Sequence, residues 1–494
     1  MSETAPQSQA GAAKTTEEQD LLDRMVTASR PIGEVATERT KSYFEEFLRQ
    51  VISPGQTISK DVISSINHWI AEIDQTLSKQ LDEILHHEEV QKLEATWRGL
   101  HYLVDQTETG EFLKIRVLNA KKEVLRNDLE RASDFDTSSL FKKVYEEGFG
   151  VYGGEPFGLM VGDYEFDYTA PDVGLLTKIA GVAAAAHAPF VAGTSPAMFK
   201  MESYTELPDP RDLTKIFESV EYAEWKAFRK EEDSRYVGLT LPRVLSRYPY
   251  GRKFKPVEEF NYEEGVDGQV HDKYLWMNAA WAYATRITEA FTMDGWFHRI
   301  RGPEGGGMVK GLPVHTFTAP GGSIEMKCPT ETLITDRREG ELSSLGFLGL
   351  LHCKNTNHAA FFGAQSVQRP DKYYNKDAQT NAELSAKFNF ILSTSRFAHY
   401  LKVMCRNWIG RIMEVEECEI ELNKWINNYV EPRPEDATDA GKAKRPLRAA
   451  KVSVTEVEGK PGWYEATAWL RPHFQLEGLN IALSLVGKIP GGNK

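Results

Sequence analysis

The sequence has few cysteines and no segment suited to a membrane. Its four cysteines, Cys328, Cys353, Cys405 and Cys418, include no C-x-x-C pair and are too few for a disulfide scaffold in a chain of 494 residues. The longest apolar stretch, residues 179–186, is far shorter than the ~20 residues that a membrane helix needs. The first residues show no basic start followed by an apolar core, so they form no secretory signal. We therefore expect a soluble, cytoplasmic protein with reduced thiols and no membrane insertion.

An excess of basic residues is also missing. The formal net charge is −13 and the isoelectric point is near 5.6. Proteins that bind nucleic acid generally hold the phosphates with clustered Lys and Arg, so we expect no nucleic-acid partner. The chain is long enough for roughly two to four domains, and its 41% of hydrophobic residues can fill their cores.

The histidines form no recognisable metal motif. An H-E-x-x-H zinc site that began at His87 would need a second histidine at position 91, which is Gln91. His352, Cys353 and His358 lie close in sequence, but the first two are neighbours on a predicted strand and would point to opposite faces. We expect neither a metal nor another cofactor.

The glycines at positions 305–307 are the one feature that could suggest a phosphate-binding loop. The P-loop spacing G-x-x-x-x-G-K-[ST] is absent, because Lys310 is followed by Gly311. A tight turn is the favoured interpretation, and an anion-binding loop is the alternative. A nucleophile elbow is absent around Ser195, which is followed by Pro196. We expect a protein that is not an enzyme.

The N-terminal part of the chain contains a short and a long helical pattern. Residues 1–14 resemble a disordered tail, and Thr15 with Glu18 has capping-box spacing for a helix that ends before Pro31. This helix is either a detached recognition element or packed on its own domain. Its apolar stripe consists of Leu21, Leu22, Met25 and Val26. A second pattern with helical spacing comprises Ile63, Ile66, Ile70, Ile73, Leu77, Leu81 and Ile84, and a third comprises Leu93, Trp97 and Leu100.

The middle of the chain alternates between strand-like and helix-like segments. This alternation predicts an α/β (α+β) fold with a mostly parallel sheet covered by helices. The expected strands lie at 113–117, 157–162, 189–193, 236–241, 314–317, 347–352 and 359–363. The expected helices lie at 121–132, 173–187, 273–292, 378–408 and 415–429.

The C-terminal part begins with a linker rich in Pro and charge at 431–448. Two alternating segments, 451–457 and 464–470, follow on either side of a turn at 459–462, so we expect a hairpin. One more strand is expected at 481–486.

Charged residues gather in two clusters of mixed sign. Such clusters are more often ion-pair networks or subunit contacts than active sites, because arginine suits desolvated interfaces. We interpret them as subunit contacts formed by Asp233, Arg235, Arg243, Asp336, Arg337, Arg338 and Glu339.

Five strings of residues carry a resemblance to a known family. The longest is EWKAFRKEEDSRYVGLTLPRVLSRYPYG at 224–251; the others are LEATWRGLHYLV at 93–104, CPTETLITDRREGELSSLGF at 328–347, SRFAHYLK at 395–402 and RPHFQLE at 471–477. In their order along the chain, these strings resemble the large subunit of the bacterial type VI secretion contractile sheath. The resemblance covers residues 21–490. A phage-tail-like injection sheath is the neighbouring alternative, and an α/β enzyme that binds an anion at the Gly305 loop is a distant one.

The resemblance implies a phage-tail-sheath-like fold with mixed sheets and an obligate small sheath subunit as partner. The two chains would form a six-fold helical tube around inner-tube hexamers, attached to a baseplate and recycled by an AAA+ unfoldase. It also implies that the stripe from Leu21 to Val26 binds the unfoldase and that C-terminal strands join neighbouring protomers. The candidate joining residues are Val452, Val454, Val457, Tyr464, Ala466 and Ala468. The expected parts are a tail (1–14), a recognition helix and linker (15–59), a helical segment that contacts the small subunit (60–110), α/β sheath domains (111–375) and a C-terminal sheath domain (376–494).

Overall fold

The computed structural model forms two compact units, each of which is considered by itself. The first comprises Met1–His87 and Pro249–Gly265, and the second comprises Glu88–Tyr248 and Val266–Lys494. The structure describes residues 22–23, 26–27, 33–51, 62–258, 260–319, 321–460, 462–473 and 475. The expected tail at 1–14, the strand at 481–486, and the stripe residues Leu21 and Met25 lie outside these residues.

The long helices in the described residues of the first unit are α2 (Glu34–Val51) and α3 (Val62–Leu85). Helix α3 confirms the long pattern that begins at Ile63, whereas α2 was not predicted because its apolar positions are few. Near the end of α3, Asp82 accepts hydrogen bonds from the Tyr262 hydroxyl at 2.6 Å and the Gly265 amide at 3.1 Å. Residues 22–23 and 26–27 are helical, and Leu22 and Val26 are buried.

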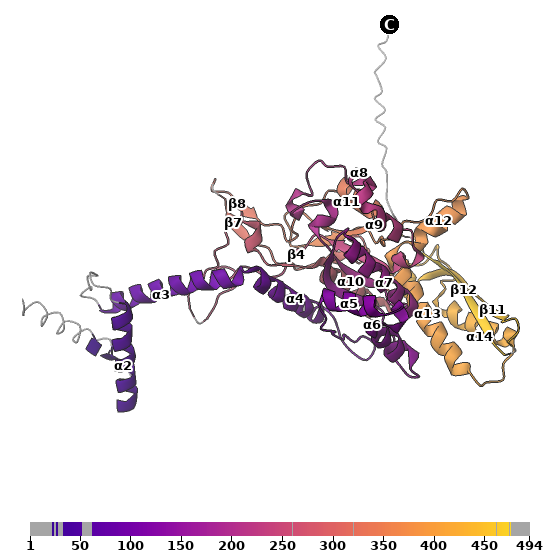
Figure 1. Cartoon of the computed structure of the whole chain (residues 1–494), viewed down its shortest axis with the longest axis horizontal. Coiled ribbons are helices and arrows are strands. Elements are labelled where there is room, and N and C mark those ends of the chain that lie inside the picture. The colour runs from indigo at the N-terminus through magenta and orange to yellow at the C-terminus, as the bar shows by residue number, and fades with distance from the viewer. Residues whose placement is uncertain are drawn as a thin grey trace, which may run out of the picture. The chain divides into compact units, whose positions relative to one another are not determined.

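A six-stranded mixed sheet organises the second unit, several of whose helices are labelled in Figure 1. The first four strands in the spatial order are parallel, and the last two are joined by antiparallel pairing, so the prediction of a mixed α/β fold is confirmed. In spatial order the strands are β1 (Met160–Phe166), β2 (Phe190–Thr194), β3 (Val237–Leu241), β9 (Phe347–His352), β10 (Ala359–Phe361) and β6 (Met308–Val309).

Helices cover both faces of this sheet because its central strands are apolar on both sides. On β9, Phe347 packs into the core beside helix α7 (Ala170–Ala186), whereas Leu348 packs into the core beside helix α10 (Ala279–Asp294). Helix α10 begins where the Asn278 side chain accepts a hydrogen bond from the Ala280 amide, and it ends at Gly295 with φ of 76°. Shorter helices are α5 (Lys122–Arg131), α6 (Ser139–Phe141), the π-helix η2 (Lys142–Gly150), α8 (Leu213–Glu218), α9 (Ala223–Phe228) and α11 (Asp336–Ser344).

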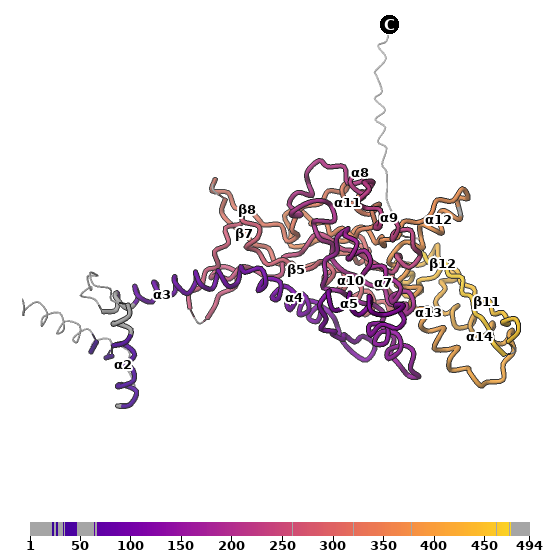
Figure 2. The backbone as a smooth tube through the Cα atoms, viewed as in Figure 1, coloured from indigo at the N-terminus to yellow at the C-terminus, as the bar shows by residue number. Residues whose placement is uncertain are grey.

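The C-terminal part of the unit packs helices against a separate two-stranded sheet, which Figure 2 shows as the orange to yellow end of the tube. The antiparallel pairing of its strands confirms the expected hairpin. The elements are α12 (Lys376–Ser385), α13 (Phe388–Trp408), α14 (Val415–Ile426), α15 (Asp439–Lys444), β11 (Leu447–Glu456) and β12 (Tyr464–Pro472).

Several expected boundaries are wrong. The helix expected at 378–408 is divided, because the Ala386 carbonyl accepts hydrogen bonds from the Ser366 amide and hydroxyl and the Phe388 amide donates to Ala364. The helix expected from 273 begins at Ala279, since residues 276–277 form β5 (Trp276–Met277) against β4 (Val244–Leu245). The linker expected at 431–448 contains α15.

The strand expected at 113–117 has no partner strand among the described residues, and β1 pairs only with β2. Ile115 packs beside Leu100 and Leu103, while Val117 and Leu118 are exposed. The strand expected at 314–317 exists as β7 (Thr316–Thr318), but it pairs with β8 (Ile324–Met326) in a small ribbon of its own. Helix α11 was not predicted because its residues are almost all polar.

Candidate functional site

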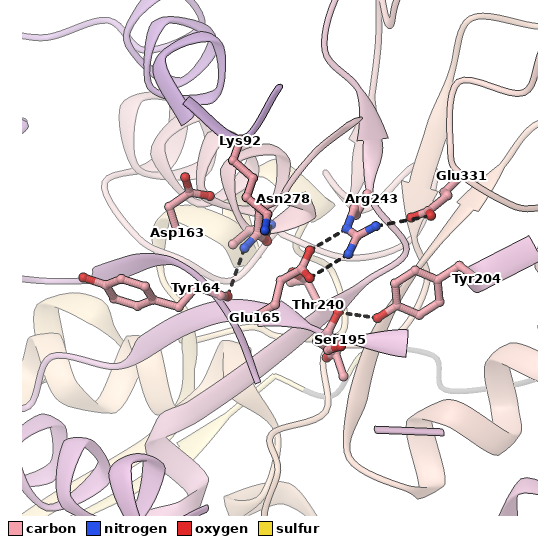
Figure 3. Close-up of polar contacts among 12 residues, drawn as sticks. Lys92, Asp163, Tyr164, Glu165, Ser195, Tyr204, Thr240, Arg243, Asn278 and Glu331 are labelled. Carbon is pink, nitrogen blue, oxygen red and sulfur yellow. Dashed lines mark hydrogen bonds and ion pairs between the residues drawn. The ribbon is translucent and has the colours of Figure 1, made fainter. Parts of the chain in front are cut away.

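The carboxyl ends of the parallel strands are the place where open α/β sheets usually bind ligands. In this chain the protein's own side chains fill that place (Figure 3). Asn278 donates to the Tyr164 carbonyl at 3.1 Å, and a Cβ at Gly193 would lie only 2.6 Å from the Asn278 amide. The buried Tyr204 hydroxyl donates to the Thr194 carbonyl, and burial raises its pKa, so it remains protonated. These contacts seal the ends of β1 and β2.

A charge network lies beside this sealed edge. The Arg243 guanidinium binds both carboxylate oxygens of Glu165, at 2.5 and 2.7 Å, and its third nitrogen lies 3.5 Å from the buried Glu331. His271 Nε2 lies 2.9 Å from the same Glu331 oxygen. Burial alone lowers the pKa of Arg243, but the hydrogen bonds and charges of the two glutamates raise it above its ordinary value. The arginine therefore stays charged and holds three segments together.

Arg235 and Arg243, which belong to the first predicted charged cluster, form ion pairs with different partners. Arg243 binds Glu165, which is 78 residues away and was not predicted, whereas Arg235 pairs with the exposed Glu232 at 3.4 Å. Burial raises the pKa of Asp233.

In α11, Asp336 and Arg337 are exposed, and Glu339 is partly buried. Arg338 binds Glu341 at 2.7 Å and donates to the carbonyls of Asp209 and Arg211. The role of both clusters as subunit contacts remains a prediction.

The glycine loop favours the tight-turn interpretation. The Gly302 amide donates to the Phe361 carbonyl at 2.7 Å, and the Gly307 amide donates to Gly302 at 2.9 Å. A Cβ at Gly305, Gly306 or Gly307 would lie 2.2–2.5 Å from a backbone oxygen. The glycines are thus needed for close contact between backbones.

One histidine that was considered for a metal site has a local partner. His352 lies 2.7 Å from the Thr356 carbonyl through Nε2. Within the described ranges, no three His, Cys, Asp or Glu side chains gather in a way that could hold a metal ion. None of the described helices has the length and apolar composition needed to cross a membrane.

Helix α4 (Glu88–Asp105) presents an apolar stripe that is largely exposed in the described structure. One face packs on α10, where a Cβ at Gly99 would overlap the ring of Trp281. On the remaining surface, Leu93 is 61% exposed and Trp97 is 63% exposed. Large apolar side chains grouped on one helix indicate a surface that a partner covers.

The hairpin of β11 and β12 has one covered face and one open face. Val452 and Val454 are buried against Cys418 and Leu422 of α14. Trp469 on the opposite face is 55% exposed. The hairpin therefore belongs to a core of its own chain and still offers a surface to other molecules.

Two family models match the chain over most of its length. One is described as EvpB/VC_A0108, tail sheath N-terminal domain, and covers residues 67–368. The other is described as EvpB/VC_A0108, tail sheath gpW/gp25-like domain, and covers residues 377–489.

One curated relative matches from end to end. The type VI secretion system sheath protein TssC1 of Pseudomonas aeruginosa is 48% identical over 497 residues, which is 100% of both chains. Two solved structures are more distant. The anti-feeding prophage baseplate matches with a TM-score of 0.32 at 11% identity, covering 64% of this chain and 66% of that one. The contracted helical sheath of the same prophage matches with a TM-score of 0.31 at 10% identity, covering 62% and 66%.

Proposed function

The chain belongs to the type VI secretion tail sheath family, and we propose that it acts there as the large subunit of a two-chain protomer. It is a structural subunit of the contractile sheath and not an enzyme. With a small sheath subunit it assembles into a six-fold helical tube around inner-tube hexamers in the cytoplasm. Contraction of this tube propels the inner tube from a baseplate.

The exposed stripe on α4 is the observation that supports an obligate partner. Obligate interfaces bury ~2,000 Å² or more and resemble a core cut in two, so each subunit alone exposes apolar surface. Leu93 and Trp97 provide such a surface on a helix whose other face is fixed to α10. The small sheath subunit is the proposed occupant, and the proposed contact region is 60–110.

Co-expression with the small-subunit gene tests this function. We expect soluble heterodimers and, by negative-stain microscopy, tubes with a cogwheel cross-section, whereas the chain alone should aggregate. Leu93→Ser combined with Trp97→Ser should abolish heterodimer formation. Val220→Ser is the matched control, because Val220 is also exposed but lies outside α4. A heterodimer that survives the double change would exclude the α4 stripe as the interface, and a monodisperse chain with no affinity for the small subunit would contradict the two-chain protomer.

The hairpin supports a second part of the proposal, in which neighbouring protomers are joined by strand addition. An added strand forms several backbone hydrogen bonds, each contributing ~1 kcal/mol net, and these move as one unit when subunits repack. The proposed residues are Val452, Val454, Val457, Tyr464, Ala466 and Ala468. Tubes that assemble from a variant lacking residues 447–472 would contradict this joint.

The N-terminal stripe is the proposed site for the AAA+ unfoldase. Leu22 and Val26 are buried, and Asp23 forms an ion pair with Lys41 of α2 at 3.1 Å. Recognition therefore requires release of this segment from its own chain. Lys41→Glu should increase unfoldase binding to assembled sheaths, because it replaces that ion pair with repulsion, whereas Leu22→Asp with Met25→Asp should abolish it. Unchanged unfoldase binding by the double variant would place the site elsewhere.

A further inference from the structure

The segment that follows α4 has the alternating pattern of a strand but joins no sheet in the described part of the chain. From Leu113 to Lys121 it continues without a helix, turn or bend, so it is extended. The nearby strand β1 lies at the edge of the six-stranded sheet and pairs only with β2. Because backbone amides and carbonyls need hydrogen-bond partners, an extended segment without a neighbouring strand is a place where another chain can bind.

Side-chain contacts hold both ends of this segment beside β1. At one end, Glu155 forms ion pairs with Lys114 and with Arg116, the second at 3.0 Å. At the other end, the Tyr164 hydroxyl of β1 donates to the Ala120 carbonyl at 2.6 Å. A binding partner therefore meets a segment that is already extended, and the entropy lost by ordering it on binding is small.

The backbone groups between these two ends are unused in the described structure. The Leu113 carbonyl accepts a hydrogen bond from the Gly110 amide at 2.9 Å, and the Ala120 carbonyl is bound by Tyr164. Among the described residues, no hydrogen bond reaches a backbone amide or carbonyl of residues 114–119. A row of free donors and acceptors on an extended segment is what an added strand binds.

The apolar side chains of the segment continue the stripe of α4. Ile115 packs beside Leu103, so the segment lies against that helix, and Val104 next to it is exposed. Neighbouring residues of an extended chain point to opposite faces, yet Val117 is 68% exposed and Leu118 is 54% exposed. Neither face of the segment is covered at this point, which is unusual for two large apolar residues in succession.

We propose that residues 114–119 are a docking strand for the small sheath subunit, which adds an extended segment of its own along them and covers Val117 and Leu118. This inference rests on the proposed two-chain protomer and extends its interface beyond residue 110. The occupant is the small subunit because the segment adjoins the α4 stripe, which that subunit is proposed to cover, so one molecule binds both. Backbone pairing then fixes the register of the two chains, while the stripe provides apolar area.

Hydrogen exchange resolved to single amides in the heterodimer tests the docking strand. A strand added along one side protects every second amide, because successive residues of an extended chain direct their backbone groups to opposite sides. Alternate amides of residues 114–119 should exchange at least about a hundredfold more slowly than in the isolated peptide, and the amides between them should exchange fast.

The other outcomes of the exchange experiment separate this inference from the proposed function. Fast exchange of all these amides in a heterodimer that forms tubes would overturn the docking strand and leave the two-chain protomer intact. Protection that appears only in tubes would assign the strand to a second copy and overturn the small subunit as its occupant. Failure of the two chains to associate would overturn the proposed function and this inference with it.

Two proline substitutions give an independent test in which each variant is compared with the other. The Val117 and Leu118 amides point to opposite sides, and neither has a partner in the described chain, so proline at either position removes no bond of the chain itself. Only one of Val117→Pro and Leu118→Pro should lower the amount of small subunit that co-purifies, by about tenfold or more, because only one of the two amides is bonded by the added strand.

Val220→Pro is the control for a proline at an exposed valine. It lies at the first residue of η5 (Val220–Tyr222), where proline is tolerated, and should leave co-purification unchanged. Normal co-purification by both Val117→Pro and Leu118→Pro would overturn the docking strand. Equal loss in both would also overturn it, because binding would then depend on the conformation of the segment and not on one row of amides.

Discussion

The two sheets of the second unit use their backbone groups in different ways. The six-stranded sheet is covered by helices on both faces, and its carboxyl ends are sealed by Asn278, Tyr204 and the network of Arg243. The two-stranded sheet is covered on one face, and its β12 edge has no partner in the described chain. A sheet that helices cover on both faces and side chains close at its carboxyl ends moves as a rigid body, whereas an unpaired edge of an open sheet can join bodies. The comparison separates the part of the subunit that keeps its shape from the part that connects it.

The largest expected effect is a loss of stability when the charge network at the sealed edge of the six-stranded sheet is broken. Arg243→Ala leaves Glu165 and the buried Glu331 without the guanidinium, and losing one partner of a buried pair costs ~3 kcal/mol or more. We expect insoluble protein or a heterodimer that unfolds at much lower urea concentration. Arg243→Lys keeps the charge without the two-pronged contact and should lose less stability. Full stability of Arg243→Ala would show that the network is a surface feature and that the sealed edge is not needed for rigidity.

A pH dependence is expected from His399, which joins α13 to the end of α7. Its Nε2 donates to the Ala186 carbonyl at 2.9 Å, and burial lowers its pKa from 6.5 to about 4. The unfolded chain therefore binds a proton before the folded chain does, so the contribution to stability is full above pH 6.5 and is lost as the pH falls toward 4. Between pH 6.5 and pH 5 the loss amounts to ~2 kcal/mol.

The control for His399 is glutamine, which can donate to Ala186 but does not titrate in this range. The free energy of unfolding of the wild-type heterodimer should fall by ~2 kcal/mol more than that of His399→Gln between these pH values. His298, whose pKa burial also lowers to about 4, is present in both proteins and cancels in the difference. Equal pH dependence of the two proteins would contradict the burial of a neutral His399.

A smaller effect is expected from Gly193→Ala in β2. The added methyl group would lie 2.6 Å from the Asn278 side chain, and such overpacking costs ~1.5 kcal/mol. Gly174→Ala is the matched control, because nothing lies within 4 Å of a Cβ at that exposed position of α7. The control should raise the free energy of unfolding by ~0.5 kcal/mol through helix propensity. A neutral Gly193→Ala would mean that the carboxyl end of β2 has room for a ligand.

Periodic patterns in the sequence allowed most of the regular elements to be predicted. Contacts between segments that are distant in the sequence could not be predicted. The strands β2, β3 and β9 and the helices α3 and α7 follow from apolar patterns. The hairpin follows from alternation on both sides of a glycine turn. Glu165 and Asn278 gave no signal in the sequence, because a single polar residue acquires its role only from the segment that the fold places beside it. The prediction of a strand at 113–117 is wrong for the chain by itself, for the same reason. The alternating pattern is present, but no strand in the described residues pairs with it.

The smallest expected effect distinguishes the edge of the hairpin from its open face. Trp469 lies on the exposed face of β12. The substitution Trp469→Thr removes the large side chain and introduces a residue that is also common in strands. Because a surface substitution rarely changes stability by more than ~0.5 kcal/mol, the heterodimer should unfold as the wild type does. If backbone hydrogen bonds at the β12 edge join the protomers, tubes of Trp469→Thr should form at the normal yield, as judged by sedimentation and microscopy. A stable heterodimer that no longer forms tubes would mean that the side chains of the open face, and not the backbone of its edge, carry the contact between protomers.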